Sequence, residues 1–201
     1  MPDTDPRKIP RQPRSRETVR AMLDATARIL VRGEPLTTNR VAEVAGVSIG
    51  SLYQYFPGKE ALVAALVERM LHDDLAWVAD QLDARALRPQ ITRIIAAVCQ
   101  RQADQGPLMA AVLPMLSEVE RDAAARRAFQ EIAGWLHERL RDEPDLRPEL
   151  SDPARLTQAV FVATTGMRWV LNEAVLQHAD WLTDPDFHAE VARLLDGLWQ
   201  P

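Results

Sequence analysis

The sequence predicts an all-α protein, with an N-terminal three-helix head that contains a helix-turn-helix, joined by a long fourth helix to a larger helical body. Apolar residues recur at helical spacing along most of the 201 residues. No run of β-branched and aromatic residues bounded by turn residues predicts a sheet. Hydrophobic residues make up 47% of the chain and aromatic residues only 5%, a mixture that favours packed helices over disorder.

The chain begins with residues 1–13, which contain several prolines and basic residues and show no periodicity. We expect this segment to be a flexible basic arm. Helical spacing starts at Ser15, and an apolar face extends from Val19 to Leu30. Gly33 is expected to end this first helix, because glycine readily adopts the left-handed conformation that follows many helices.

A second, short helix is predicted before Gly46. Val41, Val44 and Ala45 lie at i, i+3 and i+4, which is helical spacing. Thr38 is expected to be the N-cap of this helix, because a threonine hydroxyl can accept a hydrogen bond from a first-turn amide. Gly46 then supplies a turn conformation that other residues resist.

A third, very short helix is predicted directly after that turn. Ser48 is its expected N-cap, and Leu52, Tyr55 and Phe56 share one face of the stretch IGSLYQYF. Two short helices joined at a glycine form a helix-turn-helix. With the first helix packed behind them, they are predicted to form a head that spans residues 14–60.

The body, residues 61–201, is predicted to be helical throughout. Its long first helix begins near Lys59, because Pro57 and Gly58 end the preceding one. Prolines and glycines divide the remaining chain into further predicted helices, near residues 89–104, 107–116, 117–142, 152–177 and 184–199.

The stretch GVSIG, residues 46–50, matches the G-x-S-x-G elbow that presents a nucleophilic serine in α/β-hydrolases. That elbow needs a strand before the turn, whereas the residues before Gly46 have helical spacing. Ser48 is therefore not expected to be a nucleophile. Since the sequence offers no other acid/base pair or nucleophile constellation, we expect no catalytic residue and no enzyme activity.

Charge is distributed unevenly along the chain. The formal net charge is -5, but residues 1–60 contain ten Lys and Arg against seven Asp and Glu, so the remaining residues carry all of the negative excess. A basic end on an acidic body is the asymmetry of a head that binds a polyanion. Ordinary surface variation explains the charge alone equally well.

The single cysteine, Cys99, excludes an intramolecular disulfide and indicates a reducing compartment. It lies on an apolar stripe, so we expect it to be buried and inert. No N-terminal signal and no apolar stretch of 18 residues is present, which predicts a cytoplasmic protein without a membrane partner. The four histidines lack metal-binding spacing, so no metal and no cofactor are expected.

Residues 36–66, LTTNRVAEVAGVSIGSLYQYFPGKEALVAAL, resemble the DNA-binding segment of the TetR family of bacterial transcription regulators. The shared features are the threonine pair, the run Ala-x-x-Ala-Gly-Val-Ser, the run Leu-Tyr-x-Tyr-Phe and the Lys-Glu that follows. The rest of the chain matches only in being a helical body of the expected length. The resemblance implies a homodimer that binds double-stranded operator DNA with its heads and a small effector with its bodies.

The resemblance places the beginning of the third helix in the major groove, where its side chains meet base edges. Gln54 and Asn39 carry amides that can pair with adenine, while Tyr53 lies off the core face and its hydroxyl can reach a phosphate. Lys59 stands at a helix N-terminus, a natural phosphate site. The expected DNA contacts are Thr37, Thr38, Asn39, Ser48, Ile49, Gly50, Ser51, Tyr53, Gln54 and Lys59.

Bulky apolar residues occur across several helices of the body. Such residues usually form a core, but Met and Trp also line adaptable pockets between helices, and the resemblance favours a pocket for a small hydrophobic effector. The candidates for its lining are Trp77, Met109, Met115, Phe129, Trp135, Phe161, Met167 and Trp169.

The segment 156–175 carries alanine, threonine and glycine along a helix that is otherwise bulky, and small residues let another helix approach closely. The resemblance implies that the last two long helices pair with their copies into a four-helix dimer interface. Packing within one chain is the alternative. The interface candidates are Gly166, Leu194, Leu195, Leu198 and Trp199.

Taken with the resemblance, the sequence predicts a repressor that dissociates from its operator when a small, mainly apolar effector binds the C-terminal body. The alternative is an architectural or cell-division DNA-binding protein that uses the same head without an effector.

Overall fold

The computed structural model describes residues 13–81, 90–115, 123–141, 143 and 146–199, and the side chains at 123–129 and 132 lie outside that description. Within these ranges the backbone forms α-helices, short 3-10 helices and turns, and no strand. The predicted all-α class is therefore confirmed. The predicted arm lies outside the described residues except for Pro13, which is the first residue of a helix.

The helices divide into two compact units. Unit 1 comprises Met1–His72 and Ala110–Ala128, and unit 2 comprises Asp73–Met109 and Phe129–Pro201. Helix α4, Lys59–Gln81, begins in unit 1 and ends in unit 2. The division by function, into a head of residues 14–60 and a body of residues 61–201, stays a prediction.

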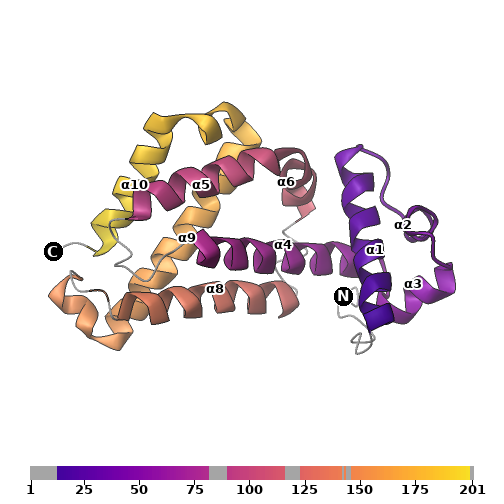
Figure 1. Cartoon of the computed structure of the whole chain (residues 1–201), viewed down its shortest axis with the longest axis horizontal. Helices are drawn as coiled ribbons and strands as arrows, with labels where there is room; N and C mark the ends of the chain where they lie inside the picture. Colours follow the sequence, from indigo (N-terminus) through magenta and orange to yellow (C-terminus); the bar gives the residue numbers. More distant parts are fainter. Residues whose placement is uncertain (1–12, 82–89, 116–122, 142, 144–145, 200–201) are drawn as a thin grey trace. The chain divides into compact units, whose positions relative to one another are not determined.

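Unit 1 contains the predicted three-helix head followed by the beginning of α4 (Figure 1). The three helices are α1 (Pro13–Val31), α2 (Thr38–Ala45) and α3 (Ile49–Tyr55). Helix α1 packs against α2, and α2 packs against α3. The core of this unit contains buried apolar side chains of these helices and of the beginning of α4, among them Met22, Leu23, Ile29, Val41, Leu52, Phe56, Leu62 and Leu66.

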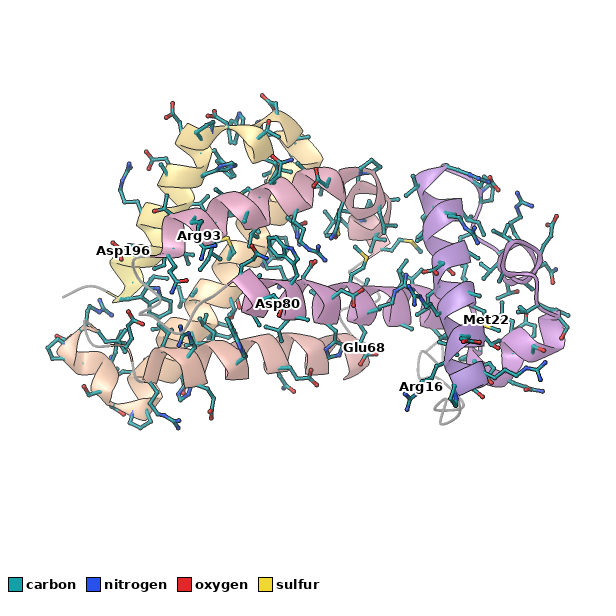
Figure 2. The ribbon with its side chains drawn as sticks, in the orientation of Figure 1. Arg16, Met22, Glu68, Asp80, Arg93 and Asp196 are labelled. Atoms are coloured by element: carbon teal, nitrogen blue, oxygen red, sulfur yellow. The ribbon has the colours of Figure 1, made fainter. Side chains whose placement is uncertain are left out.

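Burial of each such side chain contributes roughly 1.5–3 kcal/mol, so this core is what holds α2 and α3, each too short to be stable alone, in place. Figure 2 shows Met22 among the side chains of this unit and Arg16 near the beginning of α1. An ion pair adds a link between helices, because Arg69 of α4 donates to the carboxylate of Asp24 of α1 at 2.7 Å.

Unit 2 is built mainly from three helices that pack against one another. They are α5 (Ile91–Asp104), α9 (Pro153–Gln177) and α10 (Pro185–Trp199), with the 3-10 helices η3 (Pro148–Ser151) and η4 (Ala179–Thr183) at the ends of α9. Helix α5 contacts both α9 and α10, and α9 contacts α10. Buried side chains of these elements include Ile94, Ile95, Cys99, Val160, Leu171, Val175, Leu182 and Val191.

The remaining elements are α6 (Gly106–Val112), η2 (Leu113–Met115) and α8 (Ala123–Arg141). The predicted helix 107–116 therefore ends as an α-helix at Val112 and continues as a 3-10 turn. The beginning of the predicted helix 117–142 lies outside the described residues. The other predicted helices of the body are confirmed, and Asp152 and Asp184 each accept a first-turn amide hydrogen bond of 2.9 Å before a proline, as expected for N-caps.

A partly buried charged cluster joins α4 to α5 within unit 2. Asp74 Oδ1 accepts hydrogen bonds from Arg101 Nε at 2.5 Å and from Gln105 Nε2 at 3.3 Å. The guanidinium carbon of Arg101 also lies 5.0 Å from the centroid of the Trp77 ring. Because the side chains of Asp74 and Arg101 are only 22% and 26% exposed, water screens this pair less than it screens a surface ion pair.

Candidate nucleic-acid interface

The turn between α2 and α3 is formed by Gly46, which has a left-handed backbone with φ of 69°. Its amide donates to the carbonyls at the end of α2, and the amide of Val47 donates to the carbonyl of Ala42 at 3.0 Å. These bonds satisfy carbonyls that the helix end would otherwise leave open, and they redirect the chain into α3. The two helices thus form the predicted helix-turn-helix.

Thr37, and not Thr38, is the N-cap of α2. Thr37 has an extended backbone, and its hydroxyl accepts a hydrogen bond from the amide of Arg40 at 3.2 Å. The predicted cap at Thr38 is wrong, because Thr38 is already the first helical residue. Its hydroxyl lies instead 3.0 Å from the hydroxyl of Tyr53 on α3.

Ser48 is the N-cap of α3, as predicted. Its hydroxyl oxygen accepts a hydrogen bond from the amide of Ser51 at 3.0 Å and lies 2.8 Å from the hydroxyl of Ser51. Ser48 therefore has a role within the chain as well as its predicted role at DNA, which stays a prediction. Ile49 and Gly50, the two residues between Ser48 and Ser51, are exposed.

Gly50 is open on its outer side. A Cβ atom built there would meet only the Ser48 hydroxyl oxygen, at 3.9 Å, and the backbone is ordinary helix. Packing among the described residues therefore does not require glycine at this position. The missing side chain leaves the beginning of α3 open to close approach by another molecule.

The remaining predicted DNA contacts are exposed polar side chains of the same two helices and of α4. Asn39 lies in the first turn of α2, Gln54 lies in the last turn of α3, and Tyr53 precedes it with 41% of its surface exposed. Lys59 is exposed at the first residue of α4. Amide, hydroxyl and ammonium groups of this kind are the ones that proteins use on base edges and phosphates.

An ion-pair network that the sequence analysis missed holds the α1–α2 loop on α2. Arg40 Nε donates to Glu34 at 2.9 Å, and another nitrogen of the same guanidinium lies 3.0 Å from Glu43. The hydrogen bond from Arg40 is the main cause that lowers the pKa of the Glu34 carboxyl, and the bond to Glu34 is the main cause that raises the pKa of Arg40. No sequence spacing signals this pair, since its members lie in a loop and a helix.

The structure separates the residues that the sequence analysis grouped as pocket candidates. Trp77, Met109, Trp135 and Met167 are half-buried in unit 2, and Met115 is half-buried in unit 1. The side chain of Phe129 lies outside the described residues. Phe161 and Trp169 are exposed by 65% and 58%, so both point away from the core of unit 2.

Phe161 and Trp169 share an exposed face of α9 with Val162 and Leu176, which are 53% and 44% exposed. Thr165 and Asn172 lie on the same helical stripe, so four of its six positions are apolar. Four apolar side chains with this exposure are unusual on a surface that faces only water.

The predicted interface residues of α9 and α10 have different surroundings. Leu194 is 57% exposed, and Leu195 and Leu198 are half-buried. Trp199, in contrast, is only 5% exposed and its carbonyl accepts the amide of Arg147, so we assign it to the core of its own unit. A Cβ built on Gly166 would meet no atom within 4 Å, so the described residues of the chain do not make the close contact expected there.

Two other classes of site are absent from the described residues. No group of three or more His, Cys, Asp or Glu side chains in that part of the chain is placed to hold a metal ion. No helix in the same ranges is long and apolar enough to cross a membrane.

The segment around the helix-turn-helix is similar to segments of known proteins. Residues 22–66 match the family model of bacterial regulatory proteins, tetR family. Over 35 residues the chain is 51% identical to the nucleoid occlusion factor SlmA of Haemophilus ducreyi, and this match spans 17% of either protein.

Solved structures with similar folds cover nearly the whole chain. They include the fatty acid degradation regulator FadR from Bacillus halodurans (17% identity over 90% of this chain and 95% of that one, TM-score 0.61), a TetR transcriptional regulator from Rhodococcus sp. RHA1 (19%, 92% and 97%, 0.60) and a tetR-family transcriptional regulator from Streptomyces coelicolor (19%, 91% and 86%, 0.59). At such identities the likeness establishes a shared fold. The resemblance predicted from residues 36–66 is thus confirmed by the family model and by the fold.

Proposed function

We infer that this chain, a TetR-type DNA-binding transcriptional regulator by its N-terminal segment and its fold, is a repressor that leaves its operator when a small, mainly apolar effector binds the body. The observation that carries the DNA-binding step is the row of exposed polar groups on α2 and α3, which an ordered cap and turn hold in fixed positions. Rigid placement of such groups lets a short helix discriminate base edges in the major groove.

Within that row we assign two kinds of contact. Gln54 and Asn39 read bases, since an amide can donate to and accept from one adenine. Tyr53 and Lys59 contact phosphates directly, and Thr38 takes part through its contact with the Tyr53 hydroxyl. Phosphate contacts fix the position of the head on the duplex without selecting sequence. Ile49 and Gly50 approach the bases closely, and Ile49 can contact a thymine methyl group.

We propose that the functional unit is a homodimer formed through the outer face of α9. Phe161, Trp169 and Leu176 lie on that face, and Leu194 of α10 is exposed in the same unit. A twofold dimer would bury each of these side chains twice. The two heads would then bind half-sites about one turn of DNA apart, roughly 34–36 Å.

Assignment of Phe161 and Trp169 to the dimer face reduces the number of candidate residues for the effector site. Among the original candidates, the half-buried residues of unit 2 are Trp77, Met109, Trp135 and Met167. We propose that the effector contacts this set, and that Met115 and Phe129 remain candidates. Trp77 already has Arg101 over its ring, so an effector would meet its edge or displace that guanidinium.

Effector and operator are proposed to favour different dimer geometries. Helix α4 contains both Lys59, a proposed phosphate contact, and Trp77, a proposed effector contact, so a shift of this one helix would affect both sites. An effector that binds one geometry better than the other shifts the population toward it. Because such coupling is reciprocal, operator DNA would weaken effector binding by the same factor.

The test begins with duplex DNA that the purified protein selects from a random-sequence pool. We expect tight binding to the selected duplex by a dimer, measured by fluorescence anisotropy and sedimentation. A library of hydrophobic compounds is then screened by tryptophan emission, and hits should lower affinity for that duplex over the concentrations at which they bind. Hits that bind without any effect on DNA affinity would contradict the proposed repressor mechanism.

The alternative is an architectural or cell-division DNA-binding protein without an effector. The identity of a 35-residue segment with a nucleoid occlusion factor is the observation that favours it. Sequencing of chromosomal DNA recovered with the protein separates the two proposals. Sites beside a few genes support the repressor, whereas many dispersed sites whose occupancy no compound changes support the architectural protein.

A further inference from the structure

Two hydroxyl groups from different helices meet at the edge of the proposed DNA-binding surface. Thr38 Oγ1 of α2 lies 3.0 Å from Tyr53 Oη of α3, and either oxygen can be the donor. The Thr38 hydroxyl is available for this contact because Thr37 caps the helix in its place. Thr38 is half-buried, while Tyr53 is 41% exposed.

One hydrogen bond between two hydroxyls leaves part of their donor and acceptor capacity unused. Each hydroxyl has one hydrogen to donate and can accept through its lone pairs. When one of the pair donates to the other, the acceptor keeps its own hydrogen for a further partner. The pair therefore always retains one free O–H donor, and a small rotation of the two hydrogens decides which oxygen carries it.

A phosphate anion would set the direction of this pair. A phenol O–H is a stronger hydrogen-bond donor than an aliphatic O–H, and hydrogen bonds to an anion are about twice as strong as neutral ones. Tyr53 would therefore donate to the phosphate, and Thr38 would donate to the Tyr53 oxygen. Chains of hydrogen bonds polarise one another, so the bond from Thr38 strengthens the bond from Tyr53.

We propose that Thr38 is a positioning residue for Tyr53, and that the two hydroxyls act as one hydrogen-bonded unit on a single DNA phosphate. This inference rests on the proposed DNA-binding function. Thr38 fixes the phenol oxygen before DNA arrives, which reduces the ordering cost of the contact. The unit also bridges α2 and α3, so the phosphate contact is made only when both helices hold their relative position.

A double-mutant cycle tests the coupling on the duplex selected by the unaltered protein. Tyr53→Phe and Thr38→Val each remove one hydroxyl and keep the shape of the side chain. We expect about a tenfold loss of affinity for Tyr53→Phe and about a fivefold loss for Thr38→Val. The double variant should lose about as much as Tyr53→Phe alone, because Thr38 acts only through the phenol.

Matched controls separate this role from a general effect on the fold. Thr38→Ser keeps the hydroxyl and should retain most of the affinity. Thr183→Val removes an exposed hydroxyl of η4 that donates to the carbonyl of Asp180, and it should bind DNA normally. Thermal melting checks that each variant is folded, and Thr38→Ala replaces Thr38→Val if valine prevents folding.

Mapping of the contacted phosphate gives a second measurement that a merely structural role would not change. In ethylation interference, Tyr53→Phe and Thr38→Val should both lose interference at the same phosphate and keep it at the others. Additive losses in the cycle, or losses at two different phosphates, would overturn the inference while normal binding by the unaltered protein left the proposed function intact. Failure of the unaltered protein to bind any selected duplex would overturn both.

Discussion

The exposed Trp169 should decide whether α9 forms the dimer interface. Trp169 is 58% exposed, which is roughly 140 Å² of a side chain that can bury up to about 250 Å². At about 25 cal/mol per Å², burial of that area contributes roughly 3.5 kcal/mol per copy as an upper estimate. Twofold symmetry places the side chain in the interface twice, so Trp169→Glu would also bring two carboxylates into the interface.

Even if costs of association offset much of that area, we expect the Trp169→Glu dimer to be weakened by at least about a hundredfold. Sedimentation equilibrium over a wide concentration range measures this, and affinity for the selected duplex should fall in parallel. Thr92→Glu adds the same charge at an exposed position of α5 and should leave the dimer intact. If Trp169→Glu sediments as the same dimer as the unaltered protein, the interface lies elsewhere and the reasoning from exposed area is wrong.

The remaining predictions concern the head and the core. Gly46→Ala should destabilise the protein by about 1–2 kcal/mol in urea unfolding, because its φ of 69° strains a residue with a side chain although a Cβ would meet no atom within 4 Å. Thr37→Ala should lower the free energy of unfolding by about 1 kcal/mol in the same assay, because the N-cap of α2 is lost. An unchanged urea midpoint would indicate that Thr38 is the cap instead. Burial raises the pKa of the Cys99 thiol to about 11, so a disulfide reagent at pH 8 should react slowly with the native protein and rapidly after unfolding. Lys59→Ala should lower the salt slope of DNA binding by about one unit for every sequence. Gln54→Ala should instead cost about 1–3 kcal/mol of binding free energy at one base position. If both variants lose affinity equally for all sequences, Gln54 does not read a base.

Much of the head could be predicted because its signals are local. Gly46 and Ser48 are set by the few residues around them, since a turn and a cap are made by bonds within one helical turn. These local signals could not decide which of two adjacent threonines caps α2. Either hydroxyl can cap a helix, and the path of the α1–α2 loop, held by Glu34 and Arg40, determines which threonine is extended.

The sequence by itself determined the helices, their approximate bounds and the DNA-binding segment, since helical spacing and caps depend on residues close along the chain. Only the tertiary structure decided which faces are covered. Phe161 and Trp169 have the same character as buried residues, yet they lie on the side of α9 that no described helix of unit 2 covers, while Trp199 is enclosed in its own unit. Burial depends on which distant helices pack on a face, and one chain's apolar pattern is the same whether its own core or a second copy covers that face.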